Sequence, residues 1–299
     1  MIEKVLVAGS GAMGSQIAMV AALAGCEVTL YDIDRGALDR ALADLRTRLD
    51  RQVAKGRRPA EEVEAALGRL ALTTDLTEET ADVDLVIEAI VERLPLKRAF
   101  FARLDGLCPA RTLLASNSSS FVPSSMASAT ARADRFLNMH FFNPALVMAC
   151  VEVVRGPQTA DVTVEEALEF VKRLGKTSVV LDNEIPGFVA NRLLGAVRDE
   201  AIGLLEGGYA GVEAIDTAAR TALGYPMGPF ELMDLTGIDI GHLTKSARFE
   251  ETGDPADAPS ATVTRLVDQG HLGRKSGRGF YTYDEAGNRT GTADLKGQD

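Results

Sequence analysis

The chain has 299 residues, a formal net charge of −11 and no tryptophan, a length that suggests two domains with a sizeable core. The acidic balance argues against broad binding to nucleic acid or to anionic membranes. The three cysteines are widely spaced, which predicts free thiols. The first residues lead directly into a strand pattern and no apolar run has membrane-spanning length, so we expect a cytosolic location.

The first 34 residues predict a dinucleotide site. An apolar strand at residues 5–8 is followed by Gly9-Ser10-Gly11-Ala12-Met13-Gly14, by an apolar helical stretch at 17–23 and by a second strand pattern at 27–32. In such a unit the first glycine permits a tight turn, the second lets a pyrophosphate approach the backbone, and the third allows the helix to pack closely on the sheet. The helix N-terminus then offers unpaired N–H groups to the anion.

The acid that ends the second strand favours NAD over NADP. Asp32 lies 18 residues after Gly14, close to the place where a carboxylate accepts a hydrogen bond from a ribose 2′-hydroxyl. A 2′-phosphate would meet a like charge at that place. Arg35 lies close enough in sequence to offset this repulsion. We therefore expect a preference for NAD and not a strict exclusion of NADP.

Residues 36–70 contain more helix than a simple crossover requires. The pattern predicts two helices separated by Gly56-Arg57-Arg58-Pro59, and the first helix is rich in arginine and lysine. A solvated amphipathic face explains these charges. The alternative is a projecting helical arm that binds a phosphorylated tail of the substrate.

The rest of the first domain alternates strand and helix patterns, which predicts an α/β fold of the Rossmann type. This is a doubly wound, mostly parallel sheet with helices on both faces and a ligand crevice at the carboxyl ends of the strands. The strand-like runs are 70–74, 85–89, 112–116, 136–141, 151–154 and 178–182.

The composition changes near residue 185, where strand patterns stop. We expect a dinucleotide-binding domain at residues 1–185 and a smaller all-helical domain at 186–283. The second domain opens with an amphipathic helix at 188–206 that ends at Gly207-Gly208. The polar segment 284–299 is expected to be a poorly ordered tail.

One histidine is a candidate general base. His140 ends a strand, and Glu152 lies in the next strand, so strands that fold back around residue 146 would place the two opposite each other. A carboxylate on one imidazole nitrogen fixes the tautomer and leaves the other nitrogen free to act as a base. A buried carboxylate among apolar neighbours is costly unless it is paired. The alternative is a core histidine with satisfied hydrogen bonds.

Two further patterns limit the chemistry. The polar segment Ser116-Asn117-Ser118-Ser119-Ser120 follows a strand at the ligand crevice, where its hydroxyls could hold a substrate oxygen or merely form a turn. No GxSxG motif indicates a nucleophilic serine. The three histidines show no metal-ligand spacing, so no metal site is expected.

Taken in order, the motifs resemble those of the NAD-dependent L-3-hydroxyacyl-CoA dehydrogenases, especially the short bacterial 3-hydroxybutyryl-CoA dehydrogenase type. Besides the glycine motif and the serine segment, the matching motifs are Glu88-Ala89-Ile90-Val91-Glu92, His140-Phe141-Phe142-Asn143-Pro144, Val151-Glu152-Val153, Pro186-Gly187-Phe188-Val189-Ala190-Asn191-Arg192, Gly224-Tyr225-Pro226-Met227-Gly228-Pro229 and Gly273-Arg274-Lys275-Ser276-Gly277. Two departures are Ser118, where the family commonly has threonine, and Ala149, where it often has lysine or another polar residue.

The resemblance implies an NAD-dependent oxidoreductase of fatty-acid β-oxidation that converts (S)-3-hydroxyacyl-CoA to 3-ketoacyl-CoA. It implies His140 as the general base, Glu152 as its orienting partner, and Ser119 and Asn191 as polar groups that position the substrate. The reacting complex would lie between the two domains, and the helical domain would form a homodimer.

The resemblance also implies the binding residues. At the NAD site they are the glycine motif from Gly9 to Gly14, Asp32, Glu92, Lys97, Ser119 and Lys275. Arg51 and Lys55 on the basic helix, together with Ser119, would contact the acyl-CoA.

Three alternatives remain open at this point. A relative acting on a dicarboxylic substrate would be a 3-hydroxyadipyl-CoA dehydrogenase of aromatic-acid catabolism. A non-catalytic, crystallin-like relative would keep the fold without the reaction. A dehydrogenase for a small free acid would not use the basic helix for coenzyme A.

Overall fold

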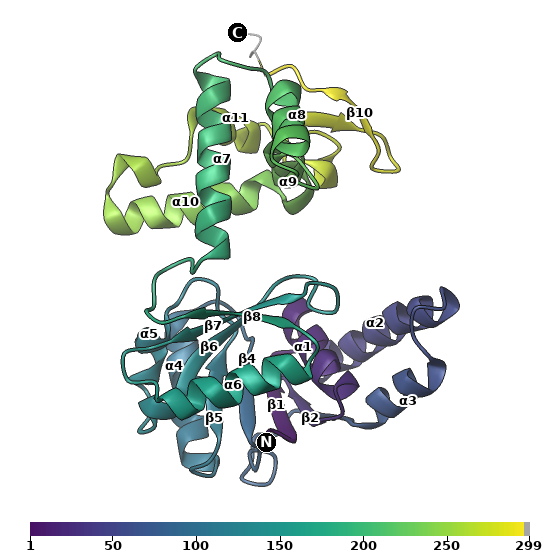
Figure 1. Cartoon of the computed structure of the whole chain (residues 1–299), viewed down its shortest axis with the longest axis vertical. Coiled ribbons are helices and arrows are strands. Elements are labelled where there is room, and N and C mark those ends of the chain that lie inside the picture. The colour runs from purple at the N-terminus through teal and green to yellow at the C-terminus, as the bar shows by residue number, and fades with distance from the viewer. Residues whose placement is uncertain (296–299) are drawn as a thin grey trace. The chain divides into compact units, whose positions relative to one another are not determined.

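The computed structural model describes residues 1–295 and divides the chain into two compact units, 1–189 and 190–299 (Figure 1). The first unit is built on a single sheet of eight strands in the order β3-β2-β1-β4-β5-β6-β7-β8. The strands are β1 (Lys4–Ala8), β2 (Glu27–Tyr31), β3 (Leu70–Thr73), β4 (Leu85–Glu88), β5 (Leu113–Ser116), β6 (Phe136–Phe141), β7 (Cys150–Arg155) and β8 (Thr177–Leu181).

The predicted mostly parallel sheet is confirmed. Every neighbouring pair in it is parallel except β6 and β7, which are antiparallel. Only residues 142–149 join these two strands, a connection too short for the crossover that parallel neighbours require. The strand β7 therefore turns back beside β6, and this reversal places residues of the two strands directly opposite each other.

Helices cover both faces of the sheet, as a doubly wound fold requires. They are α1 (Ala12–Leu23), α2 (Arg35–Ala54), α3 (Ala60–Gly68), α4 (Leu94–Leu107), α5 (Pro123–Ala127) and α6 (Asp161–Arg173). Alternate residues of β1 point to opposite faces. Val5 and Val7 join one core with α1 and α6, whereas Leu6 and Ala8 join a second core with α4 and α5.

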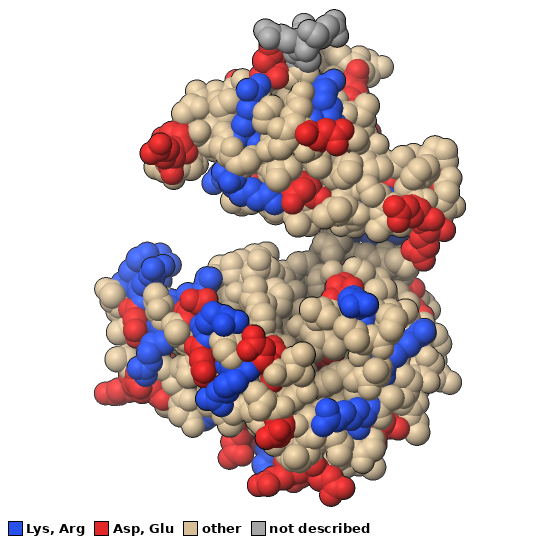
Figure 2. Space-filling model, turned by 180° about the vertical axis from the view of Figure 1, so that it is seen from behind, with Lys and Arg blue, Asp and Glu red and all other residues tan. Residues whose placement is uncertain are grey.

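The helices α2 and α3 occupy the segment that the sequence predicts to be a helical pair. Asp34 caps α2 by accepting a hydrogen bond from the backbone N–H of Gly36. One face of α2 is buried, and Arg46 joins the two helices through an ion pair with Glu64 at 2.8 Å. Figure 2 shows that basic side chains on this part of the surface lie among acidic ones.

The second unit is mainly helical. Its helices are α7 (Ala190–Glu206), α8 (Val212–Ala222), α9 (Pro229–Thr236), α10 (Ile238–Thr252) and α11 (Ala261–Asp268). The expectation that α7 begins at Phe188 is wrong by two residues. Gly187 and Phe188 have positive φ angles, 79° and 51°, and a right-handed helix cannot include such residues.

A two-stranded hairpin, β9 (Tyr281–Tyr283) and β10 (Arg289–Thr292), completes the second unit. It corrects two expectations, because this domain is not wholly helical and residues 284–295 are not a poorly ordered tail. Residues 296–299 of the predicted tail lie outside the described residues.

Two buried carboxylates hold the hairpin and α9 in place. Asp216 accepts hydrogen bonds from the backbone of Phe230 and Glu231 and from the Tyr281 hydroxyl. Asp234 accepts from the backbone of Phe280 and Tyr281 and from the Tyr283 hydroxyl. Burial raises the pKa of both carboxyl groups, although these hydrogen bonds oppose the increase. The donors at the hairpin lie 46 to 65 residues after these carboxylates in the sequence, so no local pattern connects them.

Within residues 1–295, no helix combines the length and the apolarity needed to cross a membrane.

Candidate active site

The glycine motif forms a tight loop between β1 and α1. Gly9 has a φ of 95°, and a Cβ atom there would lie 2.5 Å from the carbonyl oxygen of Ala89. A Cβ atom on Gly14 would lie 1.9 Å from the carbonyl oxygen of Gly9. The tight turn and the close packing predicted for these two glycines are therefore confirmed.

Gly11 differs from both, because a Cβ atom there would meet no atom within 4 Å. It is the N-cap residue of α1, and the first N–H groups of that helix have no partners within it. An anion approaching this space would meet backbone donors and the positive end of the helix dipole. The loop therefore fits the pyrophosphate of a dinucleotide.

Asp32 follows β2 and ties it to the glycine loop. Its Oδ2 atom accepts hydrogen bonds from the backbone N–H of Ser10 at 2.7 Å and from the Ser10 hydroxyl at 2.8 Å. Its Oδ1 atom accepts from the backbone N–H of Asp34 at 3.0 Å. Burial alone would raise the pKa of this carboxyl group, but the hydrogen bonds from Ser10 and Asp34 outweigh burial and lower it. A half-buried, ionised acceptor thus stands beside the loop.

His140 and Glu152 form the pair that the sequence predicts. They are directly opposite in the β6–β7 register, and Nδ1 of His140 lies 2.8 Å from Oε2 of Glu152. Glu152 is fully buried, and its Oε1 atom also accepts a hydrogen bond from the backbone N–H of Val189 at 3.0 Å. A carboxylate partner places a proton on Nδ1, which leaves Nε2 available to accept another.

Aromatic side chains limit the access of water to the imidazole. The ring centroid of Phe142 lies 4.5 Å from that of His140, and the ring centroid of Phe188 lies 5.5 Å from it. The side chain of His140 is 7% exposed. The positive φ at Phe188 belongs to the turn that brings this ring and the Val189 N–H group to the pair. Neither residue was predicted as a site residue.

The loop after β5 carries the candidate Ser119, which is partly buried. Its neighbour Asn117 accepts a hydrogen bond from the backbone N–H of Phe141 at 2.8 Å. This bond joins the serine loop to the residue that follows His140, so both groups lie at the carboxyl edge of the same sheet. Asn117 was not predicted as a site residue. The signal was a polar amide directly after a buried strand.

Lys97 and Glu92 lie at this edge as well, but in different environments. Lys97 is 1% exposed, and its Nζ atom lies 2.6 Å from Oε1 of Glu88 and 3.0 Å from Oε2 of Glu92. The Glu92 side chain is 39% exposed. Glu88, the fully buried last residue of β4, was not predicted as a site residue. A carboxylate that ends the apolar run Leu85-Val86-Ile87 was the available signal.

The remaining predicted residues are not brought to this edge by contacts within the first unit. Arg51 and Lys55 are exposed at the end of α2. Asn191 and Lys275 belong to the second unit, where Asn191 is in the first turn of α7 and Lys275 pairs with Asp239 at 2.6 Å. No cluster of metal-ligating side chains occurs in the part of the chain that the structure describes.

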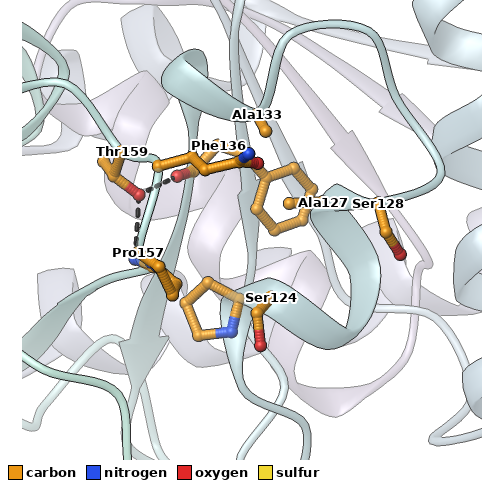
Figure 3. Close-up of a pocket in the computed structure, with 10 residues that line it drawn as sticks. Ser124, Ala127, Ser128, Ala133, Phe136, Pro157 and Thr159 are labelled. Carbon is orange, nitrogen blue, oxygen red and sulfur yellow. Dashed lines mark hydrogen bonds between the residues drawn. The ribbon is translucent and has the colours of Figure 1, made fainter.

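A separate pocket lies at the opposite end of β6 (Figure 3). Pro123, Phe136 and Pro157 line it, and the Thr159 hydroxyl is occupied by hydrogen bonds with the backbone of Phe136 and Gly156. Phe136 begins the strand that ends near His140. This mostly apolar pocket therefore contains none of the predicted site residues.

Two family models match the chain, one in each unit. Residues 4–185 match the model of the 3-hydroxyacyl-CoA dehydrogenase NAD binding domain, and residues 187–283 match that of the 3-hydroxyacyl-CoA dehydrogenase C-terminal domain. The chain is 40% identical over 284 residues to a probable 3-hydroxybutyryl-CoA dehydrogenase of Bacillus subtilis, covering 95% of this chain and 98% of that protein.

Two more relatives bear on the substrate. A 3-hydroxyadipyl-CoA dehydrogenase of Escherichia coli is 42% identical, covering 94% of this chain but only 59% of that protein. The crystal structure of (S)-3-hydroxybutyryl-CoA dehydrogenase from Ralstonia eutropha aligns with a TM-score of 0.88 at 36% identity and covers 95% of this chain and 100% of that one. With a dinucleotide loop, an imidazole–carboxylate pair and family models that match both units, the chain belongs to the 3-hydroxyacyl-CoA dehydrogenase family and is an NAD-dependent oxidoreductase.

Proposed function

We propose that this enzyme interconverts (S)-3-hydroxybutyryl-CoA, or a similarly short 3-hydroxyacyl-CoA, and the 3-ketoacyl-CoA. The single observation that carries the chemistry is the bond between His140 and the buried Glu152 at the carboxyl edge of the sheet. The names of the relatives from Bacillus subtilis and Ralstonia eutropha support the short acyl chain. A non-catalytic, crystallin-like relative is expected to have lost the catalytic residues. This chain retains the His140–Glu152 pair, which argues against that alternative.

In the oxidation direction, His140 removes the proton. Nε2 of His140 accepts the proton of the C3 hydroxyl group while the hydride leaves C3, and the imidazole becomes an imidazolium. Glu152 stabilises this new charge through the bond to Nδ1. A hydrogen bond between charged groups is worth about 1.5–3 kcal/mol. Ser119 and Asn191 would hold the substrate oxygen in line with His140.

Bound NAD would supply the hydride acceptor. The backbone N–H groups of the loop from Gly9 to Gly14, at the start of α1, would bind its pyrophosphate. Asp32 would accept a hydrogen bond from the adenosine ribose, and its ionised state favours a ribose without a 2′-phosphate. Glu92, Lys97, Ser119 and Lys275 complete the proposed cofactor site.

Arg51 and Lys55 are proposed to bind the phosphates of coenzyme A. Both are exposed cations near the end of α2, and a phosphorylated substrate would be attracted to them. The homodimer and the cytosolic location expected from the sequence stay predictions.

The test measures the reduction of acetoacetyl-CoA, 3-ketoadipyl-CoA and free acetoacetate with NADH and with NADPH. We expect the highest kcat/KM with acetoacetyl-CoA and NADH. The His140→Gln variant should lose turnover but bind NADH as the wild type does. A preference for 3-ketoadipyl-CoA would establish the alternative represented by the Escherichia coli relative. Equal rates with free acetoacetate would remove the role of Arg51 and Lys55.

A further inference from the structure

Five polar residues at the carboxyl edge of β4 and β5 form a closed ring of hydrogen bonds and ion pairs, called the carboxylate ring below. Four links join side chains, and the backbone N–H of Ser118 makes the fifth, to the Ser116 hydroxyl. The members of the ring are Glu88, Lys97, Glu92, Ser118 and Ser116. Four of them are at most 2% exposed, and only Glu92 is partly open to solvent. Burying charged groups lowers the stability of a fold unless every polar atom has a partner. A buried ring of this kind therefore suggests a role beyond packing.

Glu88 is the centre of the ring. It accepts hydrogen bonds from Nζ of Lys97 at 2.6 Å, from the Ser116 hydroxyl at 2.6 Å and from the backbone N–H of Ile90 at 2.8 Å. Three donors and no acceptor match an ionised carboxylate. Through Lys97 it fixes Glu92, and through Ser116 it fixes the loop that follows β5.

The ring holds that loop on both sides of Ser119. The Ser116 oxygen accepts a hydrogen bond from the backbone N–H of Ser118 at 3.1 Å. Beyond Ser119, the Ser118 hydroxyl accepts from the backbone N–H of Ser120 at 3.3 Å and from that of Phe121 at 2.9 Å, and it donates to Glu92. The backbone before and after Ser119 is therefore fixed by groups that are buried beneath it.

We infer that Glu88 is a positioning residue, which acts through Ser116 and Lys97 to hold Ser119 and Glu92 in their working places. This inference rests on the proposed function, in which Ser119 binds the substrate oxygen and Glu92 lies at the cofactor. Glu88 is buried and touches neither ligand. A displacement of about 1 Å at a reacting group can reduce turnover by about 100-fold, so the loss of a buried support can change the rate from a distance.

The test uses Glu88→Gln in the full-length protein, because glutamine keeps the shape of the side chain but replaces one acceptor oxygen with a donor. We expect kcat for acetoacetyl-CoA reduction to fall about 10- to 100-fold. In a Ser119→Ala background the same change should cost less than about 3-fold, because the group that Glu88 positions is gone. An equal factor in both backgrounds would mean a general structural role and would overturn the inference.

Asp84→Asn is the matched control. Asp84 is a carboxylate of the same sheet that accepts hydrogen bonds from the backbone of Glu3 and Lys4 at 2.9 and 3.0 Å, at the opposite, amino edge. Its substitution should lower the Tm, and its effect on kcat should be the same with Ser119 and with Ala at that position. Should Glu88→Gln fail to fold, Ser116→Ala removes one hydroxyl group with its two links, to Glu88 and from the Ser118 N–H, and should show the same non-additivity with a smaller effect.

Amide hydrogen exchange provides a readout that does not require activity. The Ser116 hydroxyl oxygen accepts from the N–H of Ser118, and the Ser118 hydroxyl oxygen accepts from those of Ser120 and Phe121. Ser116→Ala removes the first acceptor, and Glu88→Gln loosens the ring that holds both hydroxyl groups in place. Exchange in the peptide 116–121 should therefore accelerate in both variants but not in Asp84→Asn. Unchanged exchange in both ring variants would overturn the inference. A wild-type protein that is inactive on every 3-ketoacyl-CoA would instead refute the proposed function, and the exchange result would still decide the role of Glu88.

Discussion

Gly11 and Gly14 lie in one motif, yet alanine at the two positions should have opposite effects on folding and on binding. A Cβ atom at position 14 would lie 1.9 Å from a backbone oxygen, whereas a Cβ atom at position 11 would meet nothing within 4 Å. Gly11 has φ −62° and ψ −174°, an extended conformation that alanine adopts freely. Gly14→Ala therefore overpacks the interior, whereas Gly11→Ala fills only open space above α1.

The magnitudes follow from these distances. Overpacking against backbone that cannot move cheaply costs about 3 kcal/mol, which lowers the Tm of a unit of this size by about 6–12 °C. Alanine in place of glycine at a helix N-cap costs about 1 kcal/mol or less, so Gly11→Ala should lose at most about 4 °C. Its Kd for NADH should rise at least about 10-fold, because the added methyl group occupies the approach to the pyrophosphate donors.

The assay combines thermal unfolding with a fluorescence titration of NADH for both variants. A Gly11→Ala protein that binds NADH with the wild-type Kd would refute the placement of the pyrophosphate at this loop. A Gly14→Ala protein with an unchanged Tm would refute the packing argument.

Three other outcomes are expected. Glu152→Gln removes the charge that stabilises the His140 imidazolium, a loss of about 1.5–3 kcal/mol, so kcat should fall about 10- to 100-fold with little change in KM. The control is Glu166→Gln, which changes the surface ion pair with Arg135. An equal fall in kcat for this control would contradict the role of the His140–Glu152 pair. The pKa of Asp32 is lowered in the folded protein, so its stabilising contribution is present at neutral pH and is lost as the pH falls through that pKa. The Tm difference between wild type and Asp32→Asn should thus be largest near pH 7 and shrink below about pH 4, and a constant difference would exclude this linkage. The double variant Arg51→Ala, Lys55→Ala should raise KM for acetoacetyl-CoA, most at low salt, and leave the rate with free acetoacetate unchanged; an unchanged KM would remove these residues from the coenzyme A site.

Local patterns predicted most of the architecture. Apolar runs of strand length, the glycine motif and the acid at the end of β2 all lie within short stretches of chain, where periodicity and turn chemistry are informative. The pairing of His140 with Glu152 could also be predicted, because a short connection forces two strands to turn back and the side-chain period of two then fixes which residues face each other.

The other features could not be predicted from local patterns, because they depend on contacts between distant segments. The start of α7 depends on the backbone turn at Phe188, and the hairpin β9–β10 depends on the buried carboxylate of Asp234, 46 residues before its partner Phe280. The carboxylate ring joins Glu88 to Ser116 across 28 residues. No local pattern distinguishes such a carboxylate from an ordinary acid at the end of a strand.

The sequence by itself determined that a dinucleotide loop and a paired imidazole and carboxylate occur in one doubly wound sheet, since each of these depends on neighbours along the chain or on one tight connection. Only the tertiary structure decided that Lys97 is buried between two carboxylates, that Asn117 links the serine loop to the strand of His140, and that Glu88 supports both ends of that loop. The physical reason is that the folded sheet sets burial and hydrogen-bond partners. Glu88 and Ser116, for example, are neighbours on adjacent strands although 28 residues and the helix α4 separate them in the chain.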